Sequence, residues 1–271
     1  MLHQIQAGVK RRRPGFTLIE MLLVVAILVA LAGLVLPKLD KEQLRANKGI
    51  AANNMTGVSR YIQTYRIRHN KYPDRWDSLV DGSGNLWVPG APGTSIGLDP
   101  QLVGGPPTGS PHKLTTTTLV ENATTHEVRS LSRMNIANVL GLASSPSSPG
   151  NAFNVVTPLA NGVTVATINA SDSDGRAIID SIYPENKLST GTSGAIPSGK
   201  KLVVFGFGPL NSAIGDVLQE CPTYSNTDPT QYYNRFIAIF ECSAGGSRAE
   251  LKTVVASDAD MVGEEIGDYF E

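Results

Sequence analysis

The string RPGFTLIEMLL, residues 13–23, decides how the rest of this sequence is interpreted. It joins a basic block, formed by Lys10 and the three arginines after it, to an apolar run that only Glu20 interrupts. Residues 21–36 are all apolar or small, so with the residues just upstream the run approaches the ~20 residues that span a bilayer. By the positive-inside rule the basic block stays in the cytoplasm. We therefore expect one membrane span at about 16–37, with the N-terminus inside and the rest of the chain outside.

Glu20 is the exceptional residue of this run. A carboxylate inside a spanning helix costs at least ~2.5 kcal/mol, so it is treated as functional and needs a partner. No lysine or arginine lies within the apolar run. Cleavage between Gly15 and Phe16 would create a partner, because the new α-amino group is largely cationic at neutral pH. In a bundle of parallel helices that amine could meet Glu20 of a neighbouring, axially shifted chain, and such a pair would set the register of a polymer.

The segment from Arg13 to Leu22 resembles the class III signal of type IV prepilins and of type II secretion pseudopilins. That signal also has a basic leader, a glycine and then Phe-Thr-Leu-Ile-Glu. The resemblance covers about residues 10–40. It implies cleavage after Gly15 by a prepilin peptidase, N-methylation of Phe16, and a role for Glu20 as the assembly carboxylate.

The same resemblance implies partners and a location. Members of the family pack with copies of themselves and with other pilin-like subunits, and an inner-membrane assembly platform drives their extraction from the bilayer. The chain would then be a single-pass inner-membrane protein with a periplasmic or extracellular globular domain, and a filament subunit after assembly. A pilus and a secretion pseudopilus both remain open. The alternative is an exported or anchored binding protein or enzyme with an ordinary signal peptide, for which residues 30–32 could be the cleavage site.

An amphipathic pattern follows Pro37. We expect one helix from Phe16 to about His69, with a transmembrane half, an amphipathic half, and a bend at Gly33 and Pro37. Two helices joined near Pro37 are the alternative. The apolar residues of the second half recur at intervals of three, four or multiples of these, and they are Leu44, Ala51, Met55, Val58, Ile62 and Tyr65.

The predicted fold is α+β and pilin-like, in three parts. Residues 1–15 form a cleaved leader, residues 16–70 form the long helix, and residues 71–271 form a globular exported domain in which Tyr72 and Trp76 are core residues. An antiparallel sheet packed on the amphipathic half of the helix would bury the apolar faces of both. The β-rich runs that predict its strands are 153–159, 163–168, 201–207, 232–242 and 251–256.

Local patterns add detail to the globular domain. Residues 131–142 and 176–183 have short helical patterns. The dipeptide at 161–162, Asn-Gly, predicts a hairpin with a type I′ turn between the first two β-rich runs.

The remaining charges indicate neither nucleic acid binding nor catalysis. The chain has 23 basic and 24 acidic residues, so without the four leader cations 19 basic residues face 24 acidic ones. Without its leader cations the chain therefore lacks the excess of lysine and arginine that is typical of nucleic acid binding proteins. The four histidines are scattered, and none forms a metal-binding spacing with another histidine or with a cysteine. We expect no enzyme, no cofactor and no nucleic acid partner.

Two features near the C-terminus suggest a disulfide bond and a calcium site. Cys221 and Cys242 are the two cysteines of the chain, and they predict one disulfide in an oxidising compartment, with two separate buried thiols as the alternative. Major pseudopilins of type II secretion bind calcium near their C-terminal ends, and this resemblance leaves Ca²⁺ binding open against a solvated acidic tail. The acidic cluster in question is Asp258, Asp260, Glu264 and Glu265.

Overall fold

The computed structural model divides the chain into two compact units, Met1–Leu44 and Arg45–Glu271. The predicted leader and Phe16 lie outside the described residues. Side chains are not described at residues 34–37, 40, 41, 44, 142, 153 and 154. The structure describes residues 17–81, 84–87, 97–103, 112–142, 153–224, 232–258 and 260–263.

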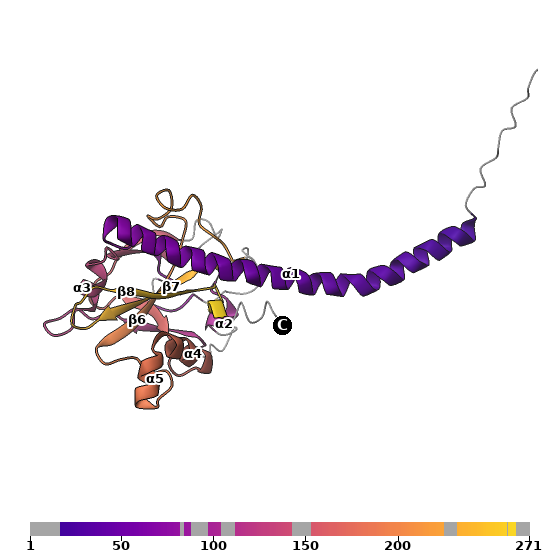
Figure 1. The fold of residues 1–271 in the computed structure, drawn as a ribbon. Coiled ribbons are helices and arrows are strands. Elements are labelled where there is room, and N and C mark those ends of the chain that lie inside the picture. The colour runs from indigo at the N-terminus through magenta and orange to yellow at the C-terminus, as the bar shows by residue number, and fades with distance from the viewer. Residues whose placement is uncertain are drawn as a thin grey trace, which may run out of the picture. The chain divides into compact units, whose positions relative to one another are not determined.

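The first element, α1, is a single helix from Leu18 to His69 (Figure 1). Its length and its end agree with the sequence-based expectation, and the helix has no break at Gly33 or Pro37, so the alternative of two helices is wrong. The bend at those two residues stays a prediction. Asn70 follows with a φ of 55°, the left-handed conformation that ends many helices. The expected span at about 16–37 is not found, because no helix among the described residues is both long and apolar enough to cross a membrane.

An eight-stranded sheet lies in the second unit. One edge of β6 pairs with β5 at Val204 and with β1 at Gly206, while the other edge pairs with β7, which in turn pairs with β8. The path is therefore β2-β5-β6-β1-β3-β4, with β7 and β8 branching from β6. The strands are β1 Trp76–Asp77, β2 Leu114–Thr118, β3 Asn138–Leu142, β4 Phe153–Pro158, β5 Thr164–Ile168, β6 Lys200–Gly206, β7 Ile237–Ser243 and β8 Glu250–Val255.

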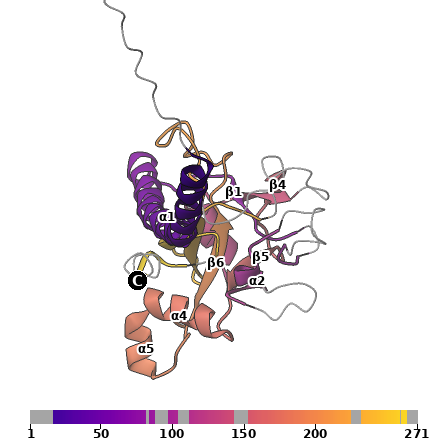
Figure 2. The same ribbon diagram turned by 90° about the vertical axis from the view of Figure 1, so that its right-hand side faces the viewer.

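Among the residues that the structure describes, four short helices accompany the sheet. Asp172 caps α4 by accepting hydrogen bonds from the backbone N–H groups of residues 174 and 175, which is the role that aspartate often has at a helix start. Figure 2 shows α4 and α5 as a connected pair beside the end of β6. The helices are α2 Pro100–Val103, α3 Glu127–Ser132, α4 Ser173–Ile182 and α5 Pro184–Thr190.

The two faces of the sheet bury two apolar clusters. Alternate residues of β6 point to opposite faces, so Val203 and Phe205 join one cluster while Leu202 and Val204 join the other. The first cluster contains the amphipathic half of α1 through Ala51, Met55, Val58 and Ile62, together with Tyr72 and Trp76. The second contains residues of α2 and α4. The expected packing of a sheet on the second half of α1 is confirmed, and the mixed helix and sheet composition fits the α+β class.

Three local predictions need correction. The sheet is not wholly antiparallel, because β1 and β3 pair in parallel. Residues 131–142 are not one helix, since α3 ends at Ser132 and β3 begins at Asn138. β4 and β5 do not form a hairpin, because β4 pairs with β3 while β5 pairs with β2 and β6. The turn between them has a positive φ at Gly162 alone, whereas a type I′ turn needs it at both central residues.

Candidate functional site

The start of α1 is held by a reciprocal cap between Thr17 and Glu20. Oε2 of Glu20 accepts hydrogen bonds from the backbone N–H and from the Oγ1 hydroxyl of Thr17, each at 2.8 Å. In return, the Glu20 N–H donates to Oγ1 of Thr17 at 3.4 Å. This is a capping box, which satisfies N–H groups that have no partner inside the helix. No described residue donates to Oε1 of Glu20, so this oxygen can accept a bond from another molecule.

The first turns of α1 expose an unusual number of large apolar side chains. From Leu18 to Leu31 these side chains are 46–82% exposed. Burying one such side chain stabilises a protein by about 1.5–3 kcal/mol, so a helix that leaves all of them open needs an apolar partner. The exposed residues are Leu18, Ile19, Met21, Leu22, Leu23, Val24, Val25, Ile27, Leu28, Val29 and Leu31.

The structure does not form the predicted disulfide, because Cys221 and Cys242 are both free. Cys242 lies opposite Lys201 at the start of β6, whereas Sγ of Cys221 donates to the carbonyl oxygen of Phe207, just after the end of β6. Six residues of strand separate these two positions by ~20 Å. A disulfide requires Cα atoms within ~7 Å, so the two thiols are too far apart.

We expect alkylation to count two free thiols. Burial raises the pKa of both Cys221 and Cys242 to about 12, so little thiolate exists at neutral pH and the folded chain should react slowly. In denaturant without reductant, mass spectrometry should find two alkyl groups per chain. A chain that takes up alkyl groups only after reduction would contradict the structure.

The acidic cluster near the C-terminus is partly neutralised by its own neighbours. Asp258 accepts a hydrogen bond from the Tyr224 hydroxyl at 2.7 Å, and Asp260 forms an ion pair with Lys113 at 2.8 Å. Glu264 and Glu265 lie outside the described residues. Within the described part of the chain, no group of three or more histidine, cysteine, aspartate or glutamate residues could hold a metal ion.

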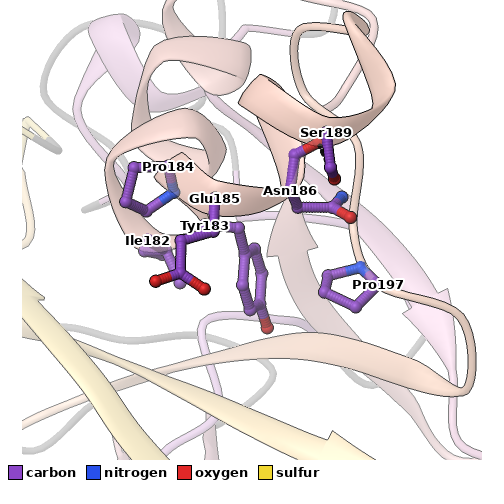
Figure 3. Close-up of a pocket in the computed structure, with 7 residues that line it drawn as sticks. All are labelled: Ile182, Tyr183, Pro184, Glu185, Asn186, Ser189 and Pro197. Carbon is purple, nitrogen blue, oxygen red and sulfur yellow. Dashed lines mark hydrogen bonds between the residues drawn. The ribbon is translucent and has the colours of Figure 1, made fainter.

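An open groove of about 600 Å³ lies between α4, α5 and the loop that precedes β6. Figure 3 shows its lining residues. The Tyr183 hydroxyl in this groove donates to Glu241 at 2.7 Å and is therefore already engaged. Glu185 is the one carboxylate of the lining, and it faces no histidine, lysine or second acid there. The groove offers a surface for contact but not an acid–base pair. Its other lining residues are Ile182, Pro184, Asn186, Ser189 and Pro197.

Asp77 is a fully buried carboxylate that the sequence analysis missed. Its Oδ2 accepts a hydrogen bond from the Tyr233 hydroxyl at 2.8 Å and lies 3.6 Å from Nη1 of Arg235, while Oδ1 has no hydrogen-bond partner among the residues that the structure describes. Burial raises the pKa of Asp77 to about 7, although Arg235 and Tyr233 act in the opposite direction. Gly208 leaves the space that this carboxylate fills, since a Cβ atom there would lie 2.3 Å from Oδ2.

Comparison with known proteins places the similarity at the N-terminal end. Residues 10–36 match the family described as the prokaryotic N-terminal methylation motif. The type II secretion system core protein G of Aeromonas hydrophila is 36% identical over 64 residues, which are 24% of this chain and 45% of that protein. The corresponding protein of Dickeya chrysanthemi is 34% identical over 64 residues, which are 24% of this chain and 42% of that protein.

A pilus protein matches over a similar region. The type IV wide pilus major component PilA4 of Thermus thermophilus is 33% identical over 70 residues, which are 26% of this chain and 53% of that protein. The chain thus spans about half the length of the curated relatives it matches. No solved structure matches the chain, so a pilin-like fold of the globular part is not confirmed.

The match over residues 10–36 is a prokaryotic N-terminal methylation motif, and it contains Gly15, Phe16 and Glu20. Over these residues the chain is similar to type IV pilin-like proteins, as the resemblance of its first residues predicts. The relatives' names describe a secretion-system core protein and a pilus component and not enzymes, in line with the non-enzymatic role expected from the sequence. The capping box was missed, although Thr-x-x-Glu before an apolar run is its known signature.

Proposed function

We propose that this chain is a structural subunit of a type IV pilus or of a type II secretion pseudopilus. The observation that carries the proposal is the combination of a methylation motif with a helix whose apolar side chains are exposed from Leu18 to Leu31. Packing of these helices against one another in a filament covers that surface. Before assembly, the acyl chains of the inner membrane cover it.

Processing supplies the polar contact that the apolar helix lacks. A prepilin peptidase removes residues 1–15, and the new N-terminal residue, Phe16, is methylated. In the sequence, Phe16 directly precedes Thr17, the first residue of the capping box. The second residue of that box, Glu20, has an oxygen, Oε1, with no donor among the described residues. The amine of one subunit and Glu20 of an axially shifted neighbour then form the contact that fixes the register.

The proposed topology follows from the order of these segments. Residues 16–70 form the helix that anchors the subunit and then lines the filament core, while residues 71–271 form a globular domain in the periplasm or outside the cell. The basic leader stays in the cytoplasm until cleavage. The inner-membrane platform extracts the subunit from the bilayer.

The N-terminal residue of the protein purified from its native membrane tests the proposal. We expect mass spectrometry to find a methylated Phe16, and Gly15→Val to leave the fifteen-residue leader in place. Gly8→Val is the matched control, because it introduces the same side chain in the leader away from the cut. A chain that begins after Ala32, or a wild-type chain that keeps its leader, would overturn the proposal in favour of an exported or anchored protein of another class.

A further inference from the structure

Four cations gather at the end of the sheet where α1 finishes. Arg66 donates to the Tyr72 hydroxyl at 2.9 Å, and its guanidinium lies 5.1 Å from the centre of that ring. The same hydroxyl accepts the Leu251 N–H at 2.9 Å, so Tyr72 links the end of α1 to the start of β8. The Tyr72 N–H in turn donates to the carbonyl oxygen of Met134 at 2.9 Å. We call Arg66, Lys71, Arg133 and Arg248 the basic surface.

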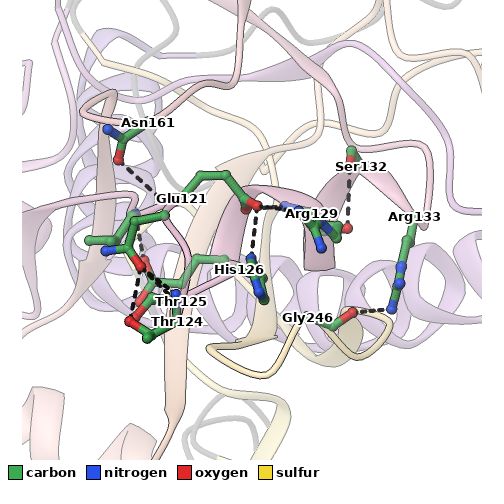
Figure 4. Close-up of polar contacts among 12 residues, drawn as sticks. Glu121, Thr124, Thr125, His126, Arg129, Ser132, Arg133, Asn161 and Gly246 are labelled. Atoms are coloured by element: carbon green, nitrogen blue, oxygen red, sulfur yellow. Dashed lines mark hydrogen bonds and ion pairs between the residues drawn. The ribbon is translucent and has the colours of Figure 1, made fainter.

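The loop between β7 and β8 joins this arrangement. Arg133 donates through Nη1 to the carbonyl oxygen of Gly246, as Figure 4 shows. The Ala249 N–H donates to the carbonyl oxygen of Ser130 in α3 at 3.0 Å, which holds the neighbouring Arg248 beside the same helix. Lys71, Arg133 and Arg248 are exposed. These hydrogen bonds join the three segments that carry the basic surface, namely the end of α1 with Lys71 after it, the end of α3, and the β7–β8 turn.

No carboxylate in the described part of the chain forms an ion pair with any of these four cations. The acids close to them are occupied by other cations. Asp216 pairs with Arg68 and His69, Glu121 pairs with His126 and Arg129, and Glu250 pairs with Lys252. A cluster of exposed like charges attracts anions from outside the unit.

The opposite charge follows β8 in the sequence. This strand starts beside Tyr72 and ends at Val255, which pairs with Ile237 at the first residue of β7, and its six residues span ~17 Å. Residues 258–271 follow, and they contain six aspartate and glutamate residues but no lysine or arginine. Asp260 is neutralised by Lys113. The sequence beyond Gly263 adds four acids with no cation.

We propose that the basic surface of one subunit binds the acidic C-terminal segment, residues 264–271, of a second copy of this chain. The inference rests on the proposed filament function and names one contact between its subunits. The opposite charges of the basic surface and the acidic segment favour a head-to-tail contact between two copies, and like charges disfavour contact between two basic surfaces. A head-to-tail contact that does not close into a ring generates a helical filament, which is the assembly proposed above.

Carbodiimide cross-linking of native filaments tests this contact, because Lys71 is the one amine of the basic surface. Filaments are grown from a mixture of ¹⁴N-labelled and ¹⁵N-labelled full-length chains. We expect mass spectrometry to find Lys71 joined to Glu264 or Glu265, in peptides that combine both labels. Raising the salt concentration before cross-linking should lower the yield, since the contact is exposed.

Two double variants separate this contact from a general effect of charge. Arg133→Glu with Arg248→Glu keeps Lys71 as the reporter but reverses two charges beside it, and the mixed-label yield should fall about tenfold. Arg176→Glu with Lys187→Glu is the matched control, because it makes the same change in net charge on α4 and α5. This control should leave the yield unchanged.

The outcomes distinguish the contact from the function. Wild-type filaments without the mixed-label product would overturn the contact and leave the filament function in place. Cross-links confined to one label would show that the segment returns to its own chain, which also overturns the contact. Filaments that instead retain a DNA duplex through Arg133 and Arg248, without the product, would assign the surface to an external polyanion. A wild-type chain that forms no filament would overturn the proposed function and the contact together.

Discussion

Replacing Glu20 with glutamine should abolish filament assembly while leaving the chain folded and processed. Glutamine keeps a side-chain acceptor for Thr17, and it occurs naturally at the third position of a capping box, so the start of α1 should persist. The substitution removes the charge that pairs with the N-terminal amine of a neighbouring subunit. The measurement is the yield of sheared filaments, compared with the amount of mature chain in the membrane.

Thr17→Ala is the matched control for this prediction. It removes the hydroxyl that bonds Glu20 and costs about 1 kcal/mol of helix capping, but it keeps the carboxylate. We expect this variant to assemble, because the role of Glu20 between subunits depends on its charge and not on its local cap. If Thr17→Ala blocked assembly and Glu20→Gln did not, the local cap would be the function of Glu20.

The helical part of the fold could be predicted from the sequence because its signals are local. Apolar spacing of three and four residues identified Ala51, Met55, Val58 and Ile62, all of which are at most 2% exposed. The end of α1 was predicted at His69 because Pro73 cannot continue a helix. The second half of α1 then defines the surface on which the sheet packs.

Strand pairing could not be predicted, because it depends on residues far apart in the chain. β4 and β5 were recognised as strands, but Asn161-Gly162 suggested that they pair with each other, and each found a different partner. β2 was missed, although its four consecutive threonines favour a strand. α5 was missed as well, since its seven residues carry no buried side chain to mark a period.

The candidate sites that could be predicted are likewise those formed by residues close together in the sequence. The motif around Glu20 is contiguous and was found, whereas the basic surface joins three distant segments and is hidden in a nearly neutral net charge. The disulfide prediction relied on the presence of two cysteines, but Cys242 lies opposite Lys201 at the start of β6 while Cys221 contacts Phe207 beyond its end. Asp77 gave no signal, because only the folded chain surrounds it with Tyr233 and Arg235.

The stability of the globular unit should fall as the pH rises from about 4 to about 7, because of Asp77. Its pKa is raised from 3.8 to about 7 in the folded chain, so within this window the folded state holds a proton that the unfolded state has lost. Stability contributed by the protonated group is complete below pH 4 and is lost by the time the pH has passed 7. The change corresponds to on the order of 4 kcal/mol in the free energy of unfolding.

Denaturant unfolding of the full chain in detergent, followed by the fluorescence of the two buried tryptophans, Trp76 and Trp87, measures this change. Asp77→Asn should flatten the dependence between pH 4 and 7, and the difference from wild type isolates Asp77 from the other acids. Tyr233→Phe removes a hydrogen bond that lowers the pKa of Asp77, so it should move the fall in stability to higher pH. If wild type and Asp77→Asn lost stability in parallel over this window, the buried carboxylate would already be ionised at pH 4, with Arg235 as an effective counter-ion.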